Sequence, residues 1–332
     1  MSFWIILISS LLILSFSLTW IIRSWALKHK IIDIPNIRSS HSKPTPRGGG
    51  LAIVITWYLG ISVLYFNDLI PTQLFYALIS GAILAFISLI DDIVSIKPLI
   101  RLTAQFITAG LALFFLDGLN EIQIYKWSVS SAWILVPFAL LAITWFINLY
   151  NFLDGIDAYA SIETISISLI LFAFTSISVT LIISACTLGF LIWNWPRAKI
   201  FMGDVGSTQL GFILIVFGIY FNNEGKFNFL YWLIFTSPFW FDATLTLYRR
   251  WRNKEKLSQA HKKHAYQRLV QAGFSHLQVD LILIALNILL FLVILAIYYY
   301  NYLLIPLFAF ILVLLYLFIR LIDKKVPFPP SV

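Results

Sequence analysis

Long apolar runs, separated by short polar stretches, repeat along the whole chain. The runs measure about 16 to 22 residues, and a helix of that length crosses ~30 Å of hydrocarbon. The pattern predicts about eleven membrane-spanning helices, near residues 3–22, 49–66, 73–90, 100–116, 130–149, 162–177, 178–193, 208–222, 228–247, 278–299 and 303–320. We therefore expect an all-α, polytopic integral membrane protein that forms a single domain over residues 1–332.

Composition supports this expectation. Of the 332 residues, 60% are hydrophobic and only 11% are charged, and the mean hydropathy is +0.89. Such values are typical of integral membrane proteins. The run from Phe3 to Ile22 has no basic residue before it and no small-residue cleavage site after it, so we interpret it as a retained first helix. Cys186 is the only cysteine, which excludes a disulfide framework and a thiolate metal cluster.

Basic residues collect in alternate loops between the predicted helices. One set of loops holds Arg23, Lys28, Lys30, Arg38, Lys43, Arg47, Lys97, Arg101, Arg197, Lys199 and the basic run 249–268, whereas the other set holds only Lys126 and Lys226. The positive-inside rule places the first set in the cytoplasm, with the N-terminus outside and, for an odd number of helices, the C-terminus inside. The net charge of +8 then reflects topology and is no sign of nucleic acid binding.

The polar motifs of the chain fall in the loops predicted to be cytoplasmic. These active-site loops cover residues 23–48, 91–101, 150–161, 194–207 and 248–277. The predicted outer loops contain scattered acids, at Asp68, Asp117, Glu121 and Glu224. Because a carboxylate at the bilayer centre costs about 3 kcal/mol or more, clustered acids are expected near helix ends. The sequence thus predicts one polar site on one face of the membrane.

The stretch FINLYNFLDGIDAYA places two amides and two carboxylates at the end of an apolar run. In a helix, Asn148, Asn151, Asp154 and Asp157 follow one another at intervals of one turn, so neighbouring pairs share a face. The glycine after Asp154 permits a break that turns the last carboxylate inward. The alternative is an ordinary polar helix end at the membrane surface.

Asp91 and Asp92 are adjacent at the end of the third predicted helix. At a separation of about 4 Å, two such charges repel by roughly 4 kcal/mol at an effective dielectric constant of 20. Either Lys97 and Arg101 neutralise the pair on a solvated face, or the pair serves a divalent cation or holds a proton for chemistry.

Asp204 stands between Gly203 and Gly206 just before the next predicted helix, in the motif FMGDVGS. Ser207 or Thr208 is a candidate N-cap for that helix. A carboxylate on a turn made flexible by glycines, with cations beside it, is a reasonable site for magnesium and pyrophosphate, because Mg²⁺ takes one or two protein oxygens together with phosphate oxygens.

Three neighbours of this motif and its first residue, Phe201, extend the candidate site. Asn194, Arg197 and Lys199 crowd beside it, which helix capping alone does not explain, and Asn194 is a candidate substrate-binding residue. Phe201 offers a flat face on which a base can stack. The alternative for Phe201 is an ordinary interfacial aromatic residue.

Two basic loops complete the set. In SHSKPTPRGGG, Lys43 and Arg47 lie on a proline-stiffened turn and offer cations to a phosphate, although the loop also fits a simple basic linker. In HKKHAYQR, His261 and His264 are three residues apart and share a face if the segment is helical. A zinc site is disfavoured because no third ligand of the usual type is near in sequence. The segment also fits a basic amphipathic stretch on anionic headgroups.

Together these motifs resemble the polyprenyl-phosphate N-acetylhexosamine-1-phosphate transferase family, of the glycosyltransferase family 4 type, which includes the bacterial translocase that makes the first lipid intermediate of peptidoglycan. The resemblance covers about residues 38–270 through SHSKPTPRGGG, the Asp91–Asp92 pair, NFLDGID, FMGDVGS and HKKHAYQR. The histidine loop is most similar to the branch that initiates bacterial O-antigen and related surface polysaccharides.

The resemblance implies that a polyprenyl (undecaprenyl) phosphate attacks the β-phosphorus of a UDP-N-acetylhexosamine with Mg²⁺, or alternatively Mn²⁺, and that UMP leaves. It also implies a bacterial inner membrane location with a cytoplasmic active site, and it leaves a homodimer open. By matching motifs, it assigns magnesium to Asp204 and Asn151, catalysis beside the lipid phosphate to Asp91 and Asp92 with Asp154 nearby, uracil to Asp157 and Phe201, phosphates to Lys43 and Arg101, and the pyrophosphate or sugar to His261 and His264.

Several alternatives stay open at this point. Either Asp91 or Asp92 is a candidate base, direct attack competes with a covalent aspartyl intermediate, and the identity of the UDP-sugar is undetermined. The family usually continues the Asp-Gly-Ile-Asp stretch with glycine, where this chain has Ala158 and Tyr159. Lys262 and Lys263 separate the histidines, which argues against a muramyl-pentapeptide substrate. A secondary transporter and a membrane pyrophosphatase or lipid phosphatase are the competing function classes.

Overall fold

The computed structural model describes residues 2–35, 43–94, 96–257, 259, 261–298 and 300–328. Its helices are α1 (Ser2–Lys28), α2 (Gly50–Phe66), α3 (Thr72–Ile79), α4 (Gly81–Ile93), α5 (Pro98–Phe115), α6 (Ala132–Leu153), α7 (Tyr159–Thr175), α8 (Val179–Asn194), α9 (Asp204–Asn223), α10 (Phe229–Phe235), α11 (Ser237–Arg252), α12 (Ala265–Gln271), α13 (His276–Ile297), the 3₁₀ helix η1 (Asn301–Leu303) and α14 (Leu304–Lys325). Two short antiparallel hairpins join β1 (Ile32–Asp33) to β2 (Thr45–Pro46) and β3 (Ile122–Ile124) to β4 (Trp127–Val129).

The helices confirm an all-α, polytopic membrane fold. Within the described residues, seven helical segments are long and apolar enough to cross a membrane, at 2–28, 72–93, 98–115, 132–153, 204–223, 276–297 and 304–325. Helices α2, α7 and α8 are apolar but shorter. Each predicted range falls on one of these helices or on the pair α10 and α11. The count of eleven crossings and the sidedness of the termini stay predictions.

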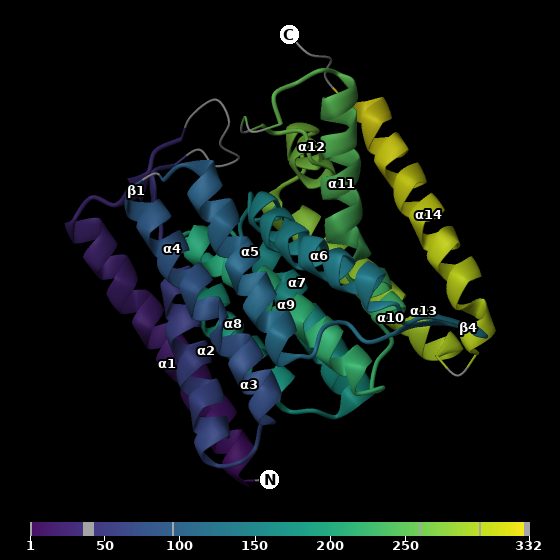
Figure 1. Cartoon of the computed structure of the whole chain (residues 1–332). Helices are drawn as coiled ribbons and strands as arrows, with labels where there is room; N and C mark the ends of the chain where they lie inside the picture. Colours follow the sequence, from purple (N-terminus) through teal and green to yellow (C-terminus); the bar gives the residue numbers. More distant parts are fainter. Residues whose placement is uncertain are drawn as a thin grey trace.

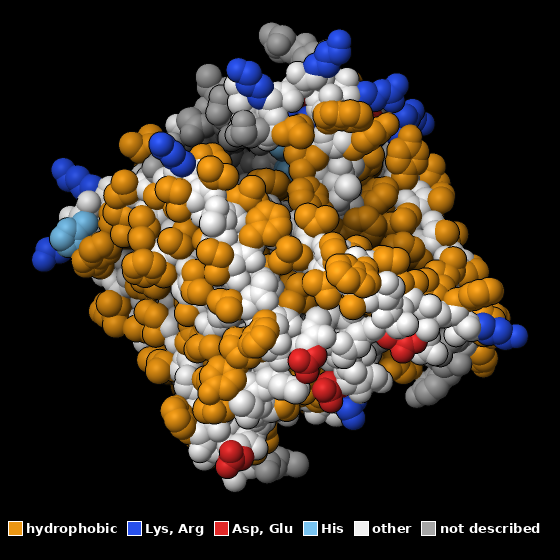
Figure 2. Space-filling model, viewed as in Figure 1, with side chains coloured by type: hydrophobic (Ala, Val, Ile, Leu, Met, Phe, Trp, Pro, Cys, Tyr) orange, Lys and Arg blue, Asp and Glu red, His pale blue; other side chains and the backbone are white. Residues whose placement is uncertain are grey.

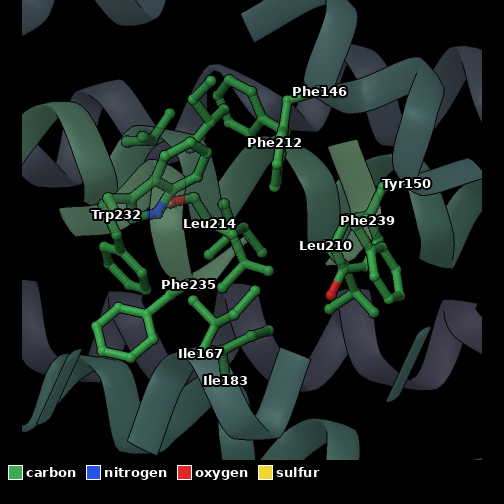
Figure 3. Packing of buried hydrophobic residues seen from close by; sticks show 14 of the residues in the cluster. Phe146, Tyr150, Ile167, Ile183, Leu210, Phe212, Leu214, Trp232, Phe235 and Phe239 are labelled. Atoms are coloured by element: carbon green, nitrogen blue, oxygen red, sulfur yellow. Dashed lines mark hydrogen bonds between the residues drawn. The ribbon is translucent and has the colours of Figure 1, made fainter. Parts of the chain in front are cut away.

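Helix α9 lies at the centre of the bundle, and 94% of the residues in its most apolar stretch of 18 residues are buried. Helices α2, α4, α6 and α7 pack against it (Figure 1). Aromatic side chains fill the space around α9, and the indole Nε1 of Trp232 donates to the Leu214 carbonyl at 3.1 Å (Figure 3). The packing fixes α9 rigidly, so its first residue is held in a defined place.

Charge divides the two ends of the bundle. Lys and Arg gather at the end that carries α11 and α12, which we call the basic end, whereas Asp and Glu dominate the exposed charges at the opposite end in this view (Figure 2). Helix α1 begins at the acidic end and α14 finishes at the basic end (Figure 1). This asymmetry is the one that the positive-inside rule uses to assign orientation.

Two helix predictions were wrong in detail. The range 228–247, predicted as one helix, breaks at Thr236 between α10 and α11. Pro238, in the first turn of α11, lacks the N–H that a continuous helix would use at that position. The range 208–222 begins four residues earlier, at Asp204, which therefore belongs to α9 and not to a flexible turn.

Candidate active site

The loop after β2 lies directly against the loop before α9. The Phe201 N–H donates to the Pro46 carbonyl at 2.8 Å, and the Gly50 N–H donates to the Met202 carbonyl at 2.8 Å. A Cβ atom on Gly50 would lie 2.4 Å from the Gly206 Cα, so glycine is required for this approach. The structure thus joins residues 46–50 of the SHSKPTPRGGG motif to the FMGDVGS motif, which is far away in sequence.

Asp92 caps the N-terminus of α9 from the end of α4. Its Oδ1 accepts the Asp204 N–H and its Oδ2 accepts the Val205 N–H, both at 3.1 Å. Gly203 has a φ of +79°, and a Cβ there would lie 2.9 Å from Asp92 Oδ2. Both the backbone turn and the close approach therefore need glycine. Asp92 places Asp204, and it does so through backbone N–H groups.

The hydroxyl caps predicted for this helix were wrong. Ser207 and Thr208 lie inside α9, where their hydroxyls donate back to the carbonyls of Gly203 at 3.2 Å and Asp204 at 2.7 Å. The reason is that a carboxylate from another helix already occupies the capping position, which periodicity within the motif does not reveal.

Arg101, in the first turn of α5, links the two acidic motifs. Its Nη1 lies 2.8 Å from Asp91 Oδ2 and 3.7 Å from Asp204 Oδ2. The other Asp91 oxygen accepts the Ile96 N–H at 2.8 Å. Arg101 therefore neutralises Asp91, one of the two outcomes expected for this pair, whereas the Lys97 side chain is exposed.

The end of α6 brings an amide and a carboxylate to the same place. Asn151 Oδ1 accepts the Ser207 hydroxyl at 2.9 Å, and its side chain also interacts with Asp204. Asp154 directly follows Leu153, the last residue of α6. Burial raises the pKa of Asp154 well above its usual value, and the nearby charges of Asp204 and Asp92 raise it further. The protonated form of Asp154 is therefore favoured.

Asp157 has a partner that sequence reasoning missed. Its Oδ2 accepts the Ala198 N–H at 3.1 Å and lies 3.1 Å from Nδ1 of His276, the first residue of α13. His276 stands at the edge of the basic loop with no spacing that links it to Asp157, so only the fold brings the two together.

Asn194 joins two loops with its amide. Its Oδ1 accepts the Ala158 N–H at 2.9 Å, and its Nδ2 donates to the Ile200 carbonyl at 3.0 Å. Ala158 has a φ of +65°, in the left-handed region. This conformation explains why the resemblance implied glycine at position 158.

A cavity of about 460 Å³ opens at the basic end between α4, α5, α6, α9 and α11. It is lined by Leu84, Ile87, Ser88, Pro98, Arg101, Leu102, Gln105, Asn148, Asn151, Phe152, Asp204, Thr208, Leu247, Arg250, Leu257, Gln259, His261 and His264. Of the predicted site residues, the cavity thus unites Arg101, Asn151, Asp204, His261 and His264. Asp91, Asp92, Asp154, Asp157, Asn194, Phe201 and Lys43 do not line it.

The two histidines meet without a shared helix, so that part of the prediction was wrong. Residues 261–264 precede α12, yet the two ring centroids are 4.9 Å apart. The pKa of His261 is lowered to about 3, chiefly by burial and in addition by the neighbouring His264 and Arg250. Its Nδ1 accepts the Lys263 N–H at 3.2 Å, so the neutral ring carries its proton on Nε2. His261 is therefore a neutral hydrogen-bond donor to the cavity.

Arg250 is a further residue that the sequence did not single out. Its guanidinium is almost fully buried and donates to the carbonyls of Lys256 at 2.7 Å, Gln259 at 3.1 Å and Leu257 at 3.2 Å. It also pairs with Glu255 at 3.1 Å. In sequence it is one of several cations in RRWRNKEK, so its role as an organiser of the loop has no local signal.

Lys43 lies at the edge of the described structure. Its side chain is exposed, and its carbonyl accepts the Thr45 hydroxyl at 3.1 Å. Residues 40–42 of the SHSKPTPRGGG motif lie outside the described residues. Phe201 is half-buried.

Comparison with known proteins decides the family. Residues 74–222, from α3 to α9, match the model of Glycosyl transferase family 4. The chain is also 30% identical over 275 residues to the "Probable undecaprenyl-phosphate N-acetylglucosaminyl 1-phosphate transferase" of Bacillus subtilis (strain 168), covering 78% of this chain and 75% of that protein. This chain belongs to glycosyl transferase family 4. The resemblance recognised from the motifs is thereby confirmed.

Two further relatives of this family 4 member differ in their named substrates. It is 29% identical to the "Undecaprenyl-phosphate alpha-N-acetylglucosaminyl 1-phosphate transferase" of Escherichia coli O157:H7, over 77% of this chain and 73% of that protein. It is 31% identical to the "Phospho-N-acetylmuramoyl-pentapeptide-transferase" of Streptococcus uberis (strain ATCC BAA-854 / 0140J), over 58% of this chain and 63% of that protein. The second match covers less of both chains.

The oxygen donors of this family 4 member fit a magnesium ion. Among the described residues, no group of three His, Cys, Asp or Glu side chains forms a ready metal centre. Magnesium needs no such centre, because it takes one or two protein oxygens and completes its shell with phosphate and water. Asp204 and Asn151 offer those oxygens on the cavity wall.

Proposed function

We propose that this protein transfers an N-acetylhexosamine-1-phosphate from a UDP-sugar to a polyprenyl phosphate and releases UMP. The observation that supports this most directly is the cavity, where Asp204, Asn151 and Arg101 stand together with His261 and His264. A site that must hold two phosphate-bearing substrates needs oxygen donors for a metal, a cation, and hydrogen-bond donors for the sugar. The step would initiate O-antigen or another cell-envelope polysaccharide, with the basic end in the bacterial cytoplasm.

The atoms of the reaction balance without a proton donor. An oxygen of the lipid phosphate forms a bond to the β-phosphorus of the UDP-sugar, and the bond from that phosphorus to the bridging oxygen of UMP breaks. UMP leaves with the electron pair. The lipid phosphate is already ionised near neutral pH, so the chain has to position the substrates and offset their charge more than it has to remove a proton.

The contacts of Asp91 and Asp92 support a role in positioning more than in proton removal. Both oxygens of Asp91 and both oxygens of Asp92 already accept hydrogen bonds, from Arg101 and from backbone N–H groups. We therefore assign both carboxylates to positioning. Asp91 positions Arg101 and Asp92 positions Asp204, while the lipid phosphate attacks the β-phosphorus directly. Bound Mg²⁺, held by Asp204 and Asn151, would supply positive charge to the pyrophosphate. Neutral His261 would donate its Nε2–H to the sugar or pyrophosphate.

The test uses detergent-solubilised protein with undecaprenyl phosphate, Mg²⁺ and a panel of UDP-sugars, and it measures UMP. We expect UMP release that requires the lipid phosphate and an N-acetylated sugar. Asp204→Asn keeps the volume but loses the charge, and it should lower turnover by about two orders of magnitude or more, as removal of other electrostatic stabilisers does. Asp68→Asn, at an exposed position in the predicted outer loop, is the matched control and should leave turnover unchanged.

Three results would contradict the proposal. Near wild-type turnover of folded Asp204→Asn at low Mg²⁺ would contradict the assignment of Asp204 as a magnesium ligand. Release of inorganic phosphate by water attack, with no need for lipid phosphate, would favour a pyrophosphatase or phosphatase. Ion or solute uptake into vesicles without UMP production would favour a transporter.

A further inference from the structure

The C-terminal end of α14 is tied to the basic segment that lines the cavity. Asp323 accepts two hydrogen bonds from Arg249, at 3.1 Å from Nη1 and 3.0 Å from Nη2. It also accepts a hydrogen bond from Arg268 Nη1. Arg268 is 1% exposed, and its Nη1 donates in addition to the Val326 carbonyl at 3.1 Å. One carboxylate thus serves two arginines from two different helices.

The residues that follow α14 continue the same contact. The Phe328 ring lies 5.3 Å from the guanidinium carbon of Arg249, 5.5 Å from that of Arg268 and 5.5 Å from Lys263 Nζ. Each such cation–ring contact is favourable, because the face of an aromatic ring attracts a positive charge. We call Asp323, Val326 and Phe328 the C-terminal clamp.

The two arginines flank the segment 253–264 in sequence, Arg249 before it and Arg268 after it. This segment forms part of the cavity wall. Arg249 immediately precedes Arg250, whose guanidinium holds the carbonyls of residues 256, 257 and 259. Arg268 lies one turn after His264, and its N–H donates to the His264 carbonyl at 3.0 Å. Between these anchors the segment contributes Leu257, Gln259, His261 and His264 to the cavity.

We propose that Asp323 is a positioning residue for the UDP-sugar, because the C-terminal clamp fixes both ends of segment 253–264. This rests on the proposed function, in which His261 and His264 contact the sugar or pyrophosphate. Asp323 itself is not among the residues that line the cavity, so it acts through Arg249 and Arg268. The clamp uses α14, a helix that lies outside residues 74–222, which match the family model.

The decisive variant is Asp323→Asn, which keeps the shape and removes the charge that two arginines share. We expect the KM for the UDP-sugar to rise about tenfold, while the KM for the lipid phosphate stays within about twofold of wild type, because only one substrate contacts the segment. Asp323→Glu should restore most of the affinity, because it returns the charge. Lys324→Gln is the matched control, since it also removes one charge but from an exposed neighbouring side chain.

A second measurement does not depend on catalysis. Lys254 and Lys256 are exposed in the segment, so limited trypsin digestion reports how firmly the backbone is held. Asp323→Asn should be cut there about tenfold faster than wild type, and Phe328→Ala, which keeps both ion pairs, should show a smaller increase. If wild type releases no UMP, the proposed function fails while digestion still tests the clamp.

The proposal is overturned if Asp323→Asn leaves both the digestion rate and the KM for the UDP-sugar unchanged. It is also overturned if both KM values change together and Asp323→Glu rescues neither, since that pattern indicates a general loss of folding. If Asp323→Asn does not fold, Phe328→Ala decides: unchanged digestion and KM in that variant would refute the clamp.

Discussion

Replacing Asp92 by Asn separates a helix cap from a catalytic base. The two side chains have nearly the same shape, so packing is preserved. In the wild-type protein, both carboxylate oxygens accept N–H groups of α9, one from Asp204 and one from Val205. Asparagine can accept only one of these, because its NH₂ group is a donor. One N–H in the first turn of α9 would therefore face another donor.

The size of the effect follows from these two bonds. A hydrogen bond to a charged group contributes about 1.5–3 kcal/mol, and a negative charge at a helix N-terminus contributes about 0.3–1 kcal/mol more. Loss of one bond and the charge weakens the first turn of α9 by about 2–4 kcal/mol. If that full amount is lost in the transition state, kcat/KM falls about 30- to 900-fold, since 1.36 kcal/mol is tenfold in rate. The fall arises because Asp204, the proposed magnesium ligand, is the residue displaced.

The assay is UMP release measured against Mg²⁺ concentration and against pH. We expect Asp92→Asn to need more Mg²⁺ than wild type and to recover part of its activity at high Mg²⁺, with an unchanged pH profile. A base would behave differently, because its removal abolishes the acidic limb of the kcat/KM profile and extra metal does not help. Observation of that pattern, or of wild-type Mg²⁺ dependence, would refute the capping argument. Asp117→Asn, exposed in the predicted outer loop, is the control.

Three further variants test other parts of the structure by thermal unfolding in detergent. Ala158→Gly should stabilise the protein by about 0.5–1 kcal/mol because it relieves the left-handed φ of +65°, whereas Ala160→Gly, buried in α7, should destabilise it. The raised pKa of Asp154 means that its protonated form is favoured, so stability is greatest below the unfolded pKa and is lost as pH rises through the folded one. Without Mg²⁺, the Asp154→Asn variant should thus be more stable than wild type at pH 8, and the difference in stability should disappear at pH ~4. Asn287→Ala removes the amide that donates to buried Glu163 at 2.7 Å, and it should lower the free energy of unfolding by about 1–3 kcal/mol. A variant as stable as wild type would contradict this role of the hydrogen bond.

The helices were predictable because hydrophobic length alone specifies them in a membrane. Every backbone polar group in lipid must be satisfied within the segment, so a long apolar run has few alternatives to a helix. Irregularities were harder. The break at Thr236 depends on Pro238, which is visible in the sequence but does not always end a helix. The hairpins β1–β2 and β3–β4 are too short to leave a periodic signal.

The candidate site was predictable in its location and less so in its pairings. The motifs point to one face because carboxylates avoid the bilayer centre and collect at helix ends. Which side chains contact one another depends on the tertiary structure. Asp92 looks like half of an acidic pair in sequence, yet it caps a helix more than a hundred residues away. Arg250 and Asp323 look like ordinary charges at a membrane surface, yet both are tied into the loop that lines the cavity.

The way α9 begins also constrains how phosphate can bind. A helix N-terminus commonly binds phosphate through its free N–H groups. Here those groups are already occupied: the Asp204 and Val205 N–H groups donate to Asp92, and the Gly206 and Ser207 N–H groups donate to the Gly203 carbonyl. The helix therefore presents the Asp204 carboxylate to the cavity where it would otherwise present N–H donors. A pyrophosphate at this point needs a positive charge between itself and Asp204, which Arg101 at 3.7 Å supplies in part and a divalent cation would complete.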